Sequence, residues 1–201
     1  MSDIDKDGFP ALELNNLLKL RKKKKLNDFQ MVNFQKKFML DTTFPNASVE
    51  TLLHAFLPHK FIDHSHSNAI LSLINQPKDK QICKKVFGNK LGIVPYIMPG
   101  FDLSKKAIEI YEKNPKVEGL ILLNHGIFTF GDTAKQSYQR MIKFISVAEK
   151  ALKNKSKKIK KDNYIEKKIE PSQIANLLRK YLSIPKEDDF EKKIISFTKL
   201  S

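Results

Sequence analysis

The chain of 201 residues contains a single cysteine, Cys83. One thiol excludes an internal disulfide, and it excludes any zinc module that is built from clustered cysteines. We expect Cys83 to be a small, half-buried residue of a helix. The chain also lacks a run of eighteen apolar residues, and residues 1–7 are acidic and polar where a signal peptide is basic and then apolar. These absences predict a soluble, cytoplasmic protein without a membrane partner.

Glycine is scarce, with seven in the chain, and no Gly-x-Gly-x-x-Gly segment occurs among them. That segment allows a backbone turn to approach a pyrophosphate, and it is typical of dinucleotide-binding folds. Its absence predicts that this chain alone has no dinucleotide-dependent dehydrogenase activity.

Arginine is also scarce, although the chain is strongly basic with a formal net charge of +15. Only three of the 37 basic residues are arginines, and arginine provides the planar, bidentate contacts that read bases and clamp phosphates. The lysines concentrate at 21–25 and 153–168, and no helix-turn-helix, zinc-finger or aromatic RNA-binding signature accompanies them. We interpret most of this charge as solvated surface and predict no nucleic-acid partner.

The length and the 41% hydrophobic content are sufficient for one compact domain with an appendage. We predict an N-terminal helical segment at 1–45, a core at 46–153 and a lysine-rich tail at 154–201. The N-terminal segment has two amphipathic stretches, and the tail is only weakly periodic, with helical pieces expected around 171–181.

Strand and helix patterns alternate through the predicted core, which indicates an α/β fold. Ser48 is a candidate N-cap for a short helix, and Asp132 is a candidate cap for the long amphipathic helix that follows the last strand. The expected strands are 60–66, 93–97, 117–123 and 126–131, and the expected helices are 11–20, 28–40, 67–74, 78–87, 103–114 and 133–153.

The segment Asp63-His64-Ser65-His66 carries the strongest chemical signal. Two imidazoles that are two residues apart lie on one face of an extended strand and point toward a common position. A third imidazole, His125, follows another predicted strand. Three neutral imidazole nitrogens suit zinc or a similar divalent metal and leave a fourth position open to substrate, which favours a catalytic site.

Other interpretations of these histidines stay open, because His-x-His pairs are common by chance. His54 lies four residues after Glu50 in a predicted helix, where it can pair with that carboxylate or pack in the core. His59 follows Pro58 in a turn. We do not assign either of these two residues as a metal ligand.

Four segments, taken in order, resemble the class II aldolase/adducin family, and most closely the aldolase part of bifunctional rhamnulose-1-phosphate aldolase/alcohol dehydrogenase proteins. The resemblance implies a three-layer α/β/α sandwich around a mixed, largely antiparallel sheet. It also implies a homo-oligomer with sites near subunit boundaries. The segments are Glu50 to His54, Asp63-His64-Ser65-His66, Val94-Pro95-Tyr96-Ile97-Met98-Pro99-Gly100-Phe101, and Asn124-His125-Gly126-Ile127-Phe128-Thr129-Phe130-Gly131-Asp132.

Carried over by position, the resemblance implies that His64, His66 and His125 are the metal ligands and that Glu50 is the catalytic acid/base. Zinc stabilises the negative charge that forms when a carbon–carbon bond beside a carbonyl is cleaved, and a nearby carboxylate can move the proton. Without the resemblance, Glu50 is an ordinary glutamate of a first helical turn. Asp63 either orients an imidazole or is an exposed strand carboxylate. The resemblance leaves the identity of the divalent metal open.

The sequence departs from the family pattern in three respects. Family members carry a phosphate-binding region before the segment that is matched here, and we expect this chain to begin after it, so that the fold is incomplete. The bifunctional relatives continue into a dehydrogenase domain, for which no fingerprint occurs. Ser65 replaces the usual threonine between the two histidines, a change that does not affect ligation.

Three functions follow from these observations. The first, which we favour, is a metal-dependent aldolase that cleaves a ketose 1-phosphate to dihydroxyacetone phosphate and an aldehyde, with a separate chain supplying the missing part. The second is a truncated or inactive fragment that binds metal or a partner without catalysis, and the expected loss of the phosphate-binding segment favours it. The third is an adducin-like binding module, against which the histidine triad with Glu50 argues.

Overall fold

The structure, a computed structural model, describes residues 9–153, 184–186 and 189–191. The chain forms two units, Met1–Ser156 and Lys157–Ser201. In the second unit, β5 (Ile184–Lys186) and β6 (Asp189–Glu191) form an antiparallel pair. The helical pieces expected around 171–181 lie outside the described residues, and the predicted division of the chain into three segments stays a prediction.

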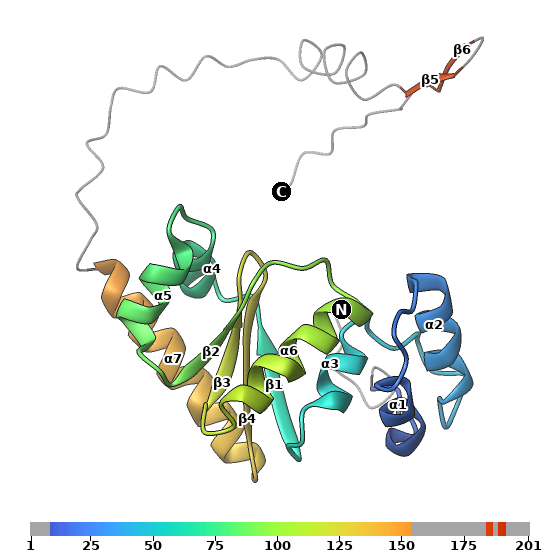
Figure 1. The fold of residues 1–201 in the computed structure, drawn as a ribbon, viewed down its shortest axis with the longest axis horizontal. Coiled ribbons are helices and arrows are strands. Elements are labelled where there is room, and N and C mark those ends of the chain that lie inside the picture. The colour runs from blue at the N-terminus through green and yellow to red at the C-terminus, as the bar shows by residue number, and fades with distance from the viewer. Residues whose placement is uncertain (1–8, 154–183, 187–188, 192–201) are drawn as a thin grey trace, which may run out of the picture. The chain divides into compact units, whose positions relative to one another are not determined.

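A four-stranded sheet forms the centre of the first unit (Figure 1). Its strands are β1 (Phe61–Ser65), β2 (Leu91–Val94), β3 (Gly119–Leu122) and β4 (Gly126–Gly131), in the order β1-β4-β3-β2. The pairs β1/β4 and β3/β4 are antiparallel, whereas β2/β3 is parallel. The predicted mixed, largely antiparallel sheet is therefore confirmed.

One face of the sheet is covered by α4 (Asn68–Ile74), α5 (Asp79–Phe87) and α7 (Ala134–Lys153). The predicted long helix is present. Met141, Phe144 and Ala148 are buried, and Ile145 and Leu152 pack partly buried against the same cluster. Tyr138 and Ile142 are 61% and 46% exposed, so two apolar side chains of the helix reach the surface.

The opposite face of the sheet is covered by α3 (Thr51–Phe56) and α6 (Phe101–Lys113). The helices α1 (Leu14–Leu20) and α2 (Asp28–Lys37) contribute to the same hydrophobic cluster, and α1 packs against α3. Figure 1 shows helices on both sides of the sheet. The first unit has the predicted three-layer α/β/α architecture.

Several element boundaries differ from the sequence-based expectations for local reasons. Strand β2 ends at Val94 rather than at residue 97 because Pro95 has no N–H to donate to the ladder. The cap of α7 is Thr133, whose Oγ1 accepts a hydrogen bond from the Gln136 N–H at 3.1 Å, rather than Asp132. Ser48 also differs from its predicted role, because its hydroxyl accepts from the Glu50 N–H at 3.2 Å and Glu50 occupies the N-cap position.

No helix among the described residues combines the length and the apolar character that crossing a membrane requires. The longest helix, α7, has 20 residues and carries charged side chains along its exposed face.

Candidate metal centre

The three histidines that the sequence singled out meet at one edge of the sheet. His64 is in β1, His66 lies one residue beyond that strand, and His125 lies in the turn between β3 and β4. Because β1 and β4 are antiparallel with Ser65 opposite Ile127, the end of β1 lies beside the start of β4. This register brings segments 60 residues apart in sequence to the same edge of the sheet.

Glu50 reaches the histidines from the first turn of α3. Its Oε1 lies 2.6 Å from Nε2 of His125 and 3.2 Å from Nε2 of His64. Nε2 of His66 is 2.9 Å from Nε2 of His64. One ligand atom from each of the four residues lies within 4.8 Å of every other, so the structure brings all four sequence-assigned residues together in a cluster able to hold a metal ion.

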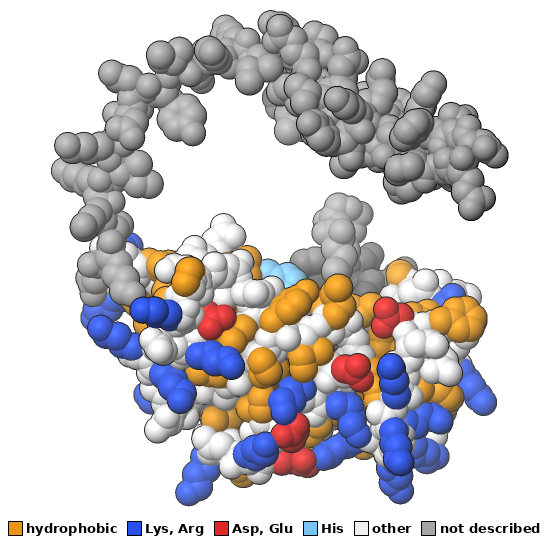
Figure 2. All heavy atoms as spheres, turned by 45° about the horizontal axis from the view of Figure 1, so that its top comes forward, with side chains coloured by type: hydrophobic (Ala, Val, Ile, Leu, Met, Phe, Trp, Pro, Cys, Tyr) orange, Lys and Arg blue, Asp and Glu red, His pale blue; other side chains and the backbone are white. Residues whose placement is uncertain are grey.

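Three members of the cluster are largely shielded from solvent, and the fourth is exposed. The side chains of His64, His125 and Glu50 are only 12%, 10% and 16% exposed, whereas His66 is an exposed residue. Histidine side chains reach the molecular surface in Figure 2. A small molecule can therefore approach the cluster from the side of His66.

A backbone carbonyl determines the tautomer of His64. Nδ1 of His64 lies 2.9 Å from the carbonyl oxygen of Ile127, and since a carbonyl oxygen only accepts, Nδ1 must donate. In the neutral imidazole, Nε2 then carries a lone pair that faces the Glu50 oxygen. Two facing acceptors require a cation between them, either a proton on the imidazole or a metal ion, and a second hydrogen bond of this kind is typical of metal-binding histidines.

Packing holds the His64 ring in this orientation. The ring stacks on Phe128 with centroids 4.0 Å apart and an interplanar angle of 17°. Phe128 is fully buried and pairs directly with His64 across β1 and β4. His54 approaches the same phenyl ring edge-on at 5.2 Å. The aromatic contacts therefore position an imidazole that the sequence pattern located but did not orient.

Gly126 creates the space in which the imidazoles lie. A Cβ at this position would be 2.6 Å from the Ser65 carbonyl oxygen, 2.9 Å from the His66 ring and 3.0 Å from the His64 ring. Asn124, two residues earlier, has a φ of 56°, a left-handed conformation that asparagine tolerates better than most residues. The turn around His125 thus depends on the residues on either side of it, Asn124 and Gly126.

The electrostatics of the cluster favour an ionised carboxylate. Burial opposes ionisation of Glu50, but hydrogen bonds from His125 and His64, together with their charges, outweigh it and hold the pKa of Glu50 well below its usual range. Burial and the neighbouring imidazoles His64 and His125 lower the pKa of His66. A neutral imidazole with an available lone pair is the form that binds a metal.

The remaining candidates of the sequence lie outside the cluster. His54 packs against Phe128, and burial lowers its pKa. His59 stacks on Phe130 with centroids 4.1 Å apart, and its Nε2 is buried without a hydrogen-bond partner among the described residues. The side chain of Asp63 makes no hydrogen bond within the described part of the chain. The orienting acceptor of His64 is instead the Ile127 carbonyl.

Sequence reasoning missed three contributors to the site: the Ile127 carbonyl, the Phe128 ring and the absent side chain of Gly126. The carbonyl and the ring leave no signal in a single sequence, because both depend on the β1/β4 register. The glycine that directly follows His125 was a usable signal, since glycine in a strand often marks a close approach.

Comparison with known proteins agrees with this geometry. The sequence model of the Class II Aldolase and Adducin N-terminal domain matches residues 18–152. The chain belongs to the class II aldolase and adducin family. The match includes all four residues of the candidate metal centre, and class II aldolases typically depend on a divalent metal.

Two relatives place the chain within the family. A protein of Bacillus subtilis (strain 168) named "Uncharacterized oxidoreductase YuxG" is 39% identical over 148 residues, which are 74% of this chain and 22% of that protein. The chain thus matches about a fifth of that relative's length. The structure of an N-terminal class II aldolase domain from Thermoplasma acidophilum is 41% identical, covers 74% of this chain and 68% of that chain, and superposes with a TM-score of 0.68.

Proposed function

We propose that this chain is the metal-binding core of a zinc-dependent, aldolase-type lyase. Its substrate is a ketose 1-phosphate similar to rhamnulose 1-phosphate, and its products are dihydroxyacetone phosphate and an aldehyde. The observation that carries the proposal is the convergence of Glu50 Oε1 with the Nε2 atoms of His64, His66 and His125.

The donor set fits zinc. Three imidazoles are a common protein ligand set of catalytic zinc, and they leave a fourth position for water or substrate. Ligand nitrogens around a tetrahedral zinc ion are about 3.3 Å apart, close to the 2.9 Å between the Nε2 atoms of His64 and His66. When bound, the metal supplies Lewis-acid stabilisation of the negative charge that develops beside the cleaved bond.

Glu50 supplies the proton chemistry in this proposal. The carboxylate is ionised because the two imidazoles lower its pKa, so it begins as a proton acceptor and returns the proton later as an acid. Its position at the start of α3, behind His64 and His125, directs it toward the same point as the imidazoles. Its low exposure keeps bulk water from competing for the proton.

The proposal includes partners. The substrate phosphate is bound by a separate chain that supplies the N-terminal part of the fold, and the active form is a homo-oligomer. The alternative is a fragment that binds metal or a partner without catalysis. The two differ in turnover rather than in metal binding, so the experiment measures both.

The first experiment is the metal content of the purified, tag-free chain by elemental mass spectrometry. We expect close to one zinc ion per chain, and loss of that metal in a His64→Ala/His66→Ala double variant. Asp63→Asn is the matched control, because it changes the same strand without touching the cluster. Equal zinc in the double variant would contradict the site assignment.

The second arm measures aldol cleavage by the metal-loaded chain, with and without an N-terminal partner chain. Glu50→Gln should retain the metal and lose turnover by at least about 100-fold, the usual contribution of a general acid/base. If Glu50→Gln turns over substrate as fast as the wild type, the proposed role of Glu50 is wrong. A folded, zinc-loaded chain without turnover in either arm would support the non-catalytic alternative.

A further inference from the structure

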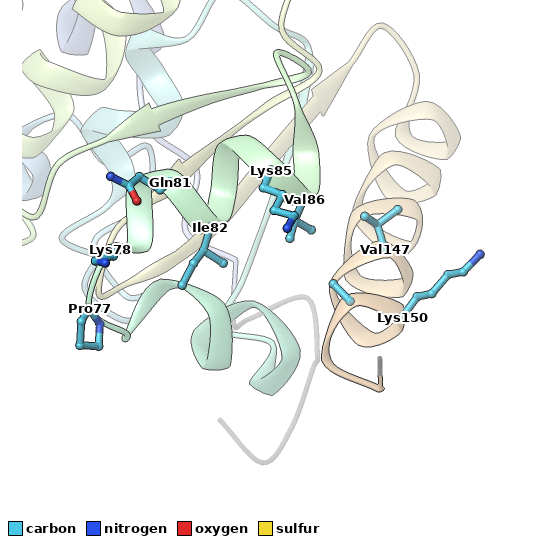
Figure 3. A pocket seen from close by; sticks show the side chains of 9 residues that line it. Pro77, Lys78, Gln81, Ile82, Lys85, Val86, Val147 and Lys150 are labelled. Atoms are coloured by element: carbon cyan, nitrogen blue, oxygen red, sulfur yellow. The ribbon is translucent and has the colours of Figure 1, made fainter. Parts of the chain in front are cut away.

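A groove of about 630 Å³ lies between α5 and α7, outside the metal centre (Figure 3). Its volume is within the range of binding pockets. The residues that line it come from both helices and from the turn that precedes α5. They are Pro77, Lys78, Gln81, Ile82, Lys85, Val86, Val147, Lys150 and Ala151.

The floor of the groove is aliphatic. Ile82 and Val86 are half-buried and pack on the hydrophobic cluster beneath α4, α5 and α7. Val147 is 36% exposed on the α7 side, opposite these two residues. Two neighbouring helices thus leave an apolar furrow between them, a shape that fits the apolar stripe of a third helix.

The charged residues that line the groove are all basic. Lys78, Lys85 and Lys150 line it, and none of the described residues that line it is acidic. Lys78 is the N-cap residue of α5 and Lys85 follows seven residues later within the helix, a separation of about two helical turns, or about 10 Å along the axis. A second helix that lies along α5 can carry two acidic residues with the same separation, seven positions apart. Each carboxylate then lies near one of the two lysines.

The backbone at Lys78 is strained. Lys78 has a φ of 67° and occupies the N-cap position of α5. A left-handed conformation is costly for a residue with a Cβ, and glycine or asparagine is the usual choice. Backbone strain of this kind is concentrated at functional sites, and Lys78 is also one of the residues that line the groove.

We propose that the groove between α5 and α7 binds an acidic amphipathic helix of a partner protein. Apolar side chains of that helix occupy the aliphatic floor, and acidic side chains at positions i and i+7 pair with Lys85 and Lys78. Among the described residues that line the groove, Gln81 is the only one with an uncharged polar side chain. The groove therefore has few groups that could orient a small polar ligand, and it favours a ligand recognised by shape and charge.

The test uses a fluorescein-labelled helical peptide of about 15 residues, with glutamate at i and i+7 and leucine at i+3 and i+4. Fluorescence anisotropy with the full chain should show saturable binding. A peptide with lysine in place of both glutamates should not bind. Equal binding of the charge-reversed peptide, or no binding of either peptide, would overturn the proposal.

Variants of the chain locate the binding. Lys85→Gln should raise the dissociation constant about two- to fivefold, as expected for the loss of a partly exposed ion pair. Lys84→Gln, on the same helix but outside the groove, should leave the dissociation constant unchanged. Val147→Asp should weaken binding at least about tenfold, since it places a carboxylate in the aliphatic floor. Equal effects of Lys84→Gln and Lys85→Gln would place the peptide elsewhere and contradict the proposal.

The strained lysine provides a further control for folding. Lys78→Gly should raise Tm, because glycine adopts a positive φ without a Cβ clash, and it should nevertheless weaken peptide binding. Lower stability combined with unchanged binding would show that Lys78 serves the turn and not a ligand.

Discussion

At the scale of single residues, Gly126 is the position on which the geometry of the metal cluster depends most. A Cβ there would lie 2.6 Å from the Ser65 carbonyl oxygen and against the imidazoles of His64 and His66. These atoms belong to a strand and to packed rings, so they cannot move without disturbing the β1/β4 register.

We therefore expect Gly126→Ala to lower the free energy of unfolding by about 1–3 kcal/mol, the usual cost of overpacking, and to weaken zinc binding at least about tenfold. Urea denaturation and a competition assay with a zinc chelator measure the two effects. Gly92→Ala is the matched control, because its Cβ would meet the end of the Leu120 side chain, which can move. Gly92→Ala should leave zinc affinity unchanged, and an equal loss in both variants would contradict the packing argument.

Cys83, also a single-residue feature, predicts a pH dependence of stability. Burial, together with the charge of Asp79, raises the pKa of the Cys83 thiol to about 11 from an ordinary value of 9.0. As pH rises above 9, the unfolded chain loses the thiol proton while the folded chain keeps it until about pH 11. The unfolded state is then favoured, so stability falls across this window.

The expected measurement is urea denaturation at pH 8.5 and pH 10.5. The wild type should lose more stability between these two pH values than Cys83→Ala, which lacks the thiol, and lysine titration is common to both proteins. Parallel pH profiles of the two proteins would mean that the thiol titrates at the same pH in the folded and unfolded states.

At the scale of elements, the start of α2 has a complete capping box. The Asn27 side chain accepts a hydrogen bond from the Gln30 N–H at 2.8 Å, and the Gln30 side chain accepts one from the Asn27 N–H at 3.2 Å. These bonds satisfy two backbone donors that a helix start otherwise leaves to solvent.

Asn27→Ala should therefore lower the free energy of unfolding by about 1 kcal/mol. The resulting decrease in Tm is large enough to measure by differential scanning fluorimetry. Zinc content should stay at the wild-type level, because α2 contributes no ligand. Asn33→Ala, in the middle of the same helix, is the control and should cost less. A loss of zinc in Asn27→Ala would show that α2 also supports the metal centre.

At the scale of the whole molecule, the metal cluster joins three parts of the fold: the end of β1, the β3/β4 turn and the start of α3. These segments lie in different layers, so a bound ion cross-links the sheet to a helix that covers it. An ion that binds only the folded state stabilises the chain by mass action.

At a free zinc concentration about 100 times the dissociation constant, the stabilisation is about 2.7 kcal/mol, which corresponds to roughly 5–10 °C in Tm for a domain of this size. Thermal unfolding after chelation and after zinc titration measures the difference. The His64→Ala/His66→Ala variant should show no zinc-dependent Tm. A zinc-dependent shift of the same size in that variant would place the ion at another site.

The amino-acid sequence by itself determined the α/β fold class, the order of the core elements and the three histidines of the cluster. Periodicity is a local property, so the strands around His64 and His125 and the helix that begins at 134 were readable from side-chain spacing. The assignment of Glu50 depended on the family resemblance, because a lone glutamate at a helix start has no distinctive pattern.

Only the tertiary structure decided what surrounds those residues. The acceptor for His64, the stacking of its ring on Phe128 and the space at Gly126 all arise from the pairing of β1 with β4, which joins segments about 60 residues apart. The groove between α5 and α7 likewise exists only because two helices pack on the same face of the sheet. Local patterns specify elements, whereas contacts between distant segments form sites, and a single sequence does not record those contacts.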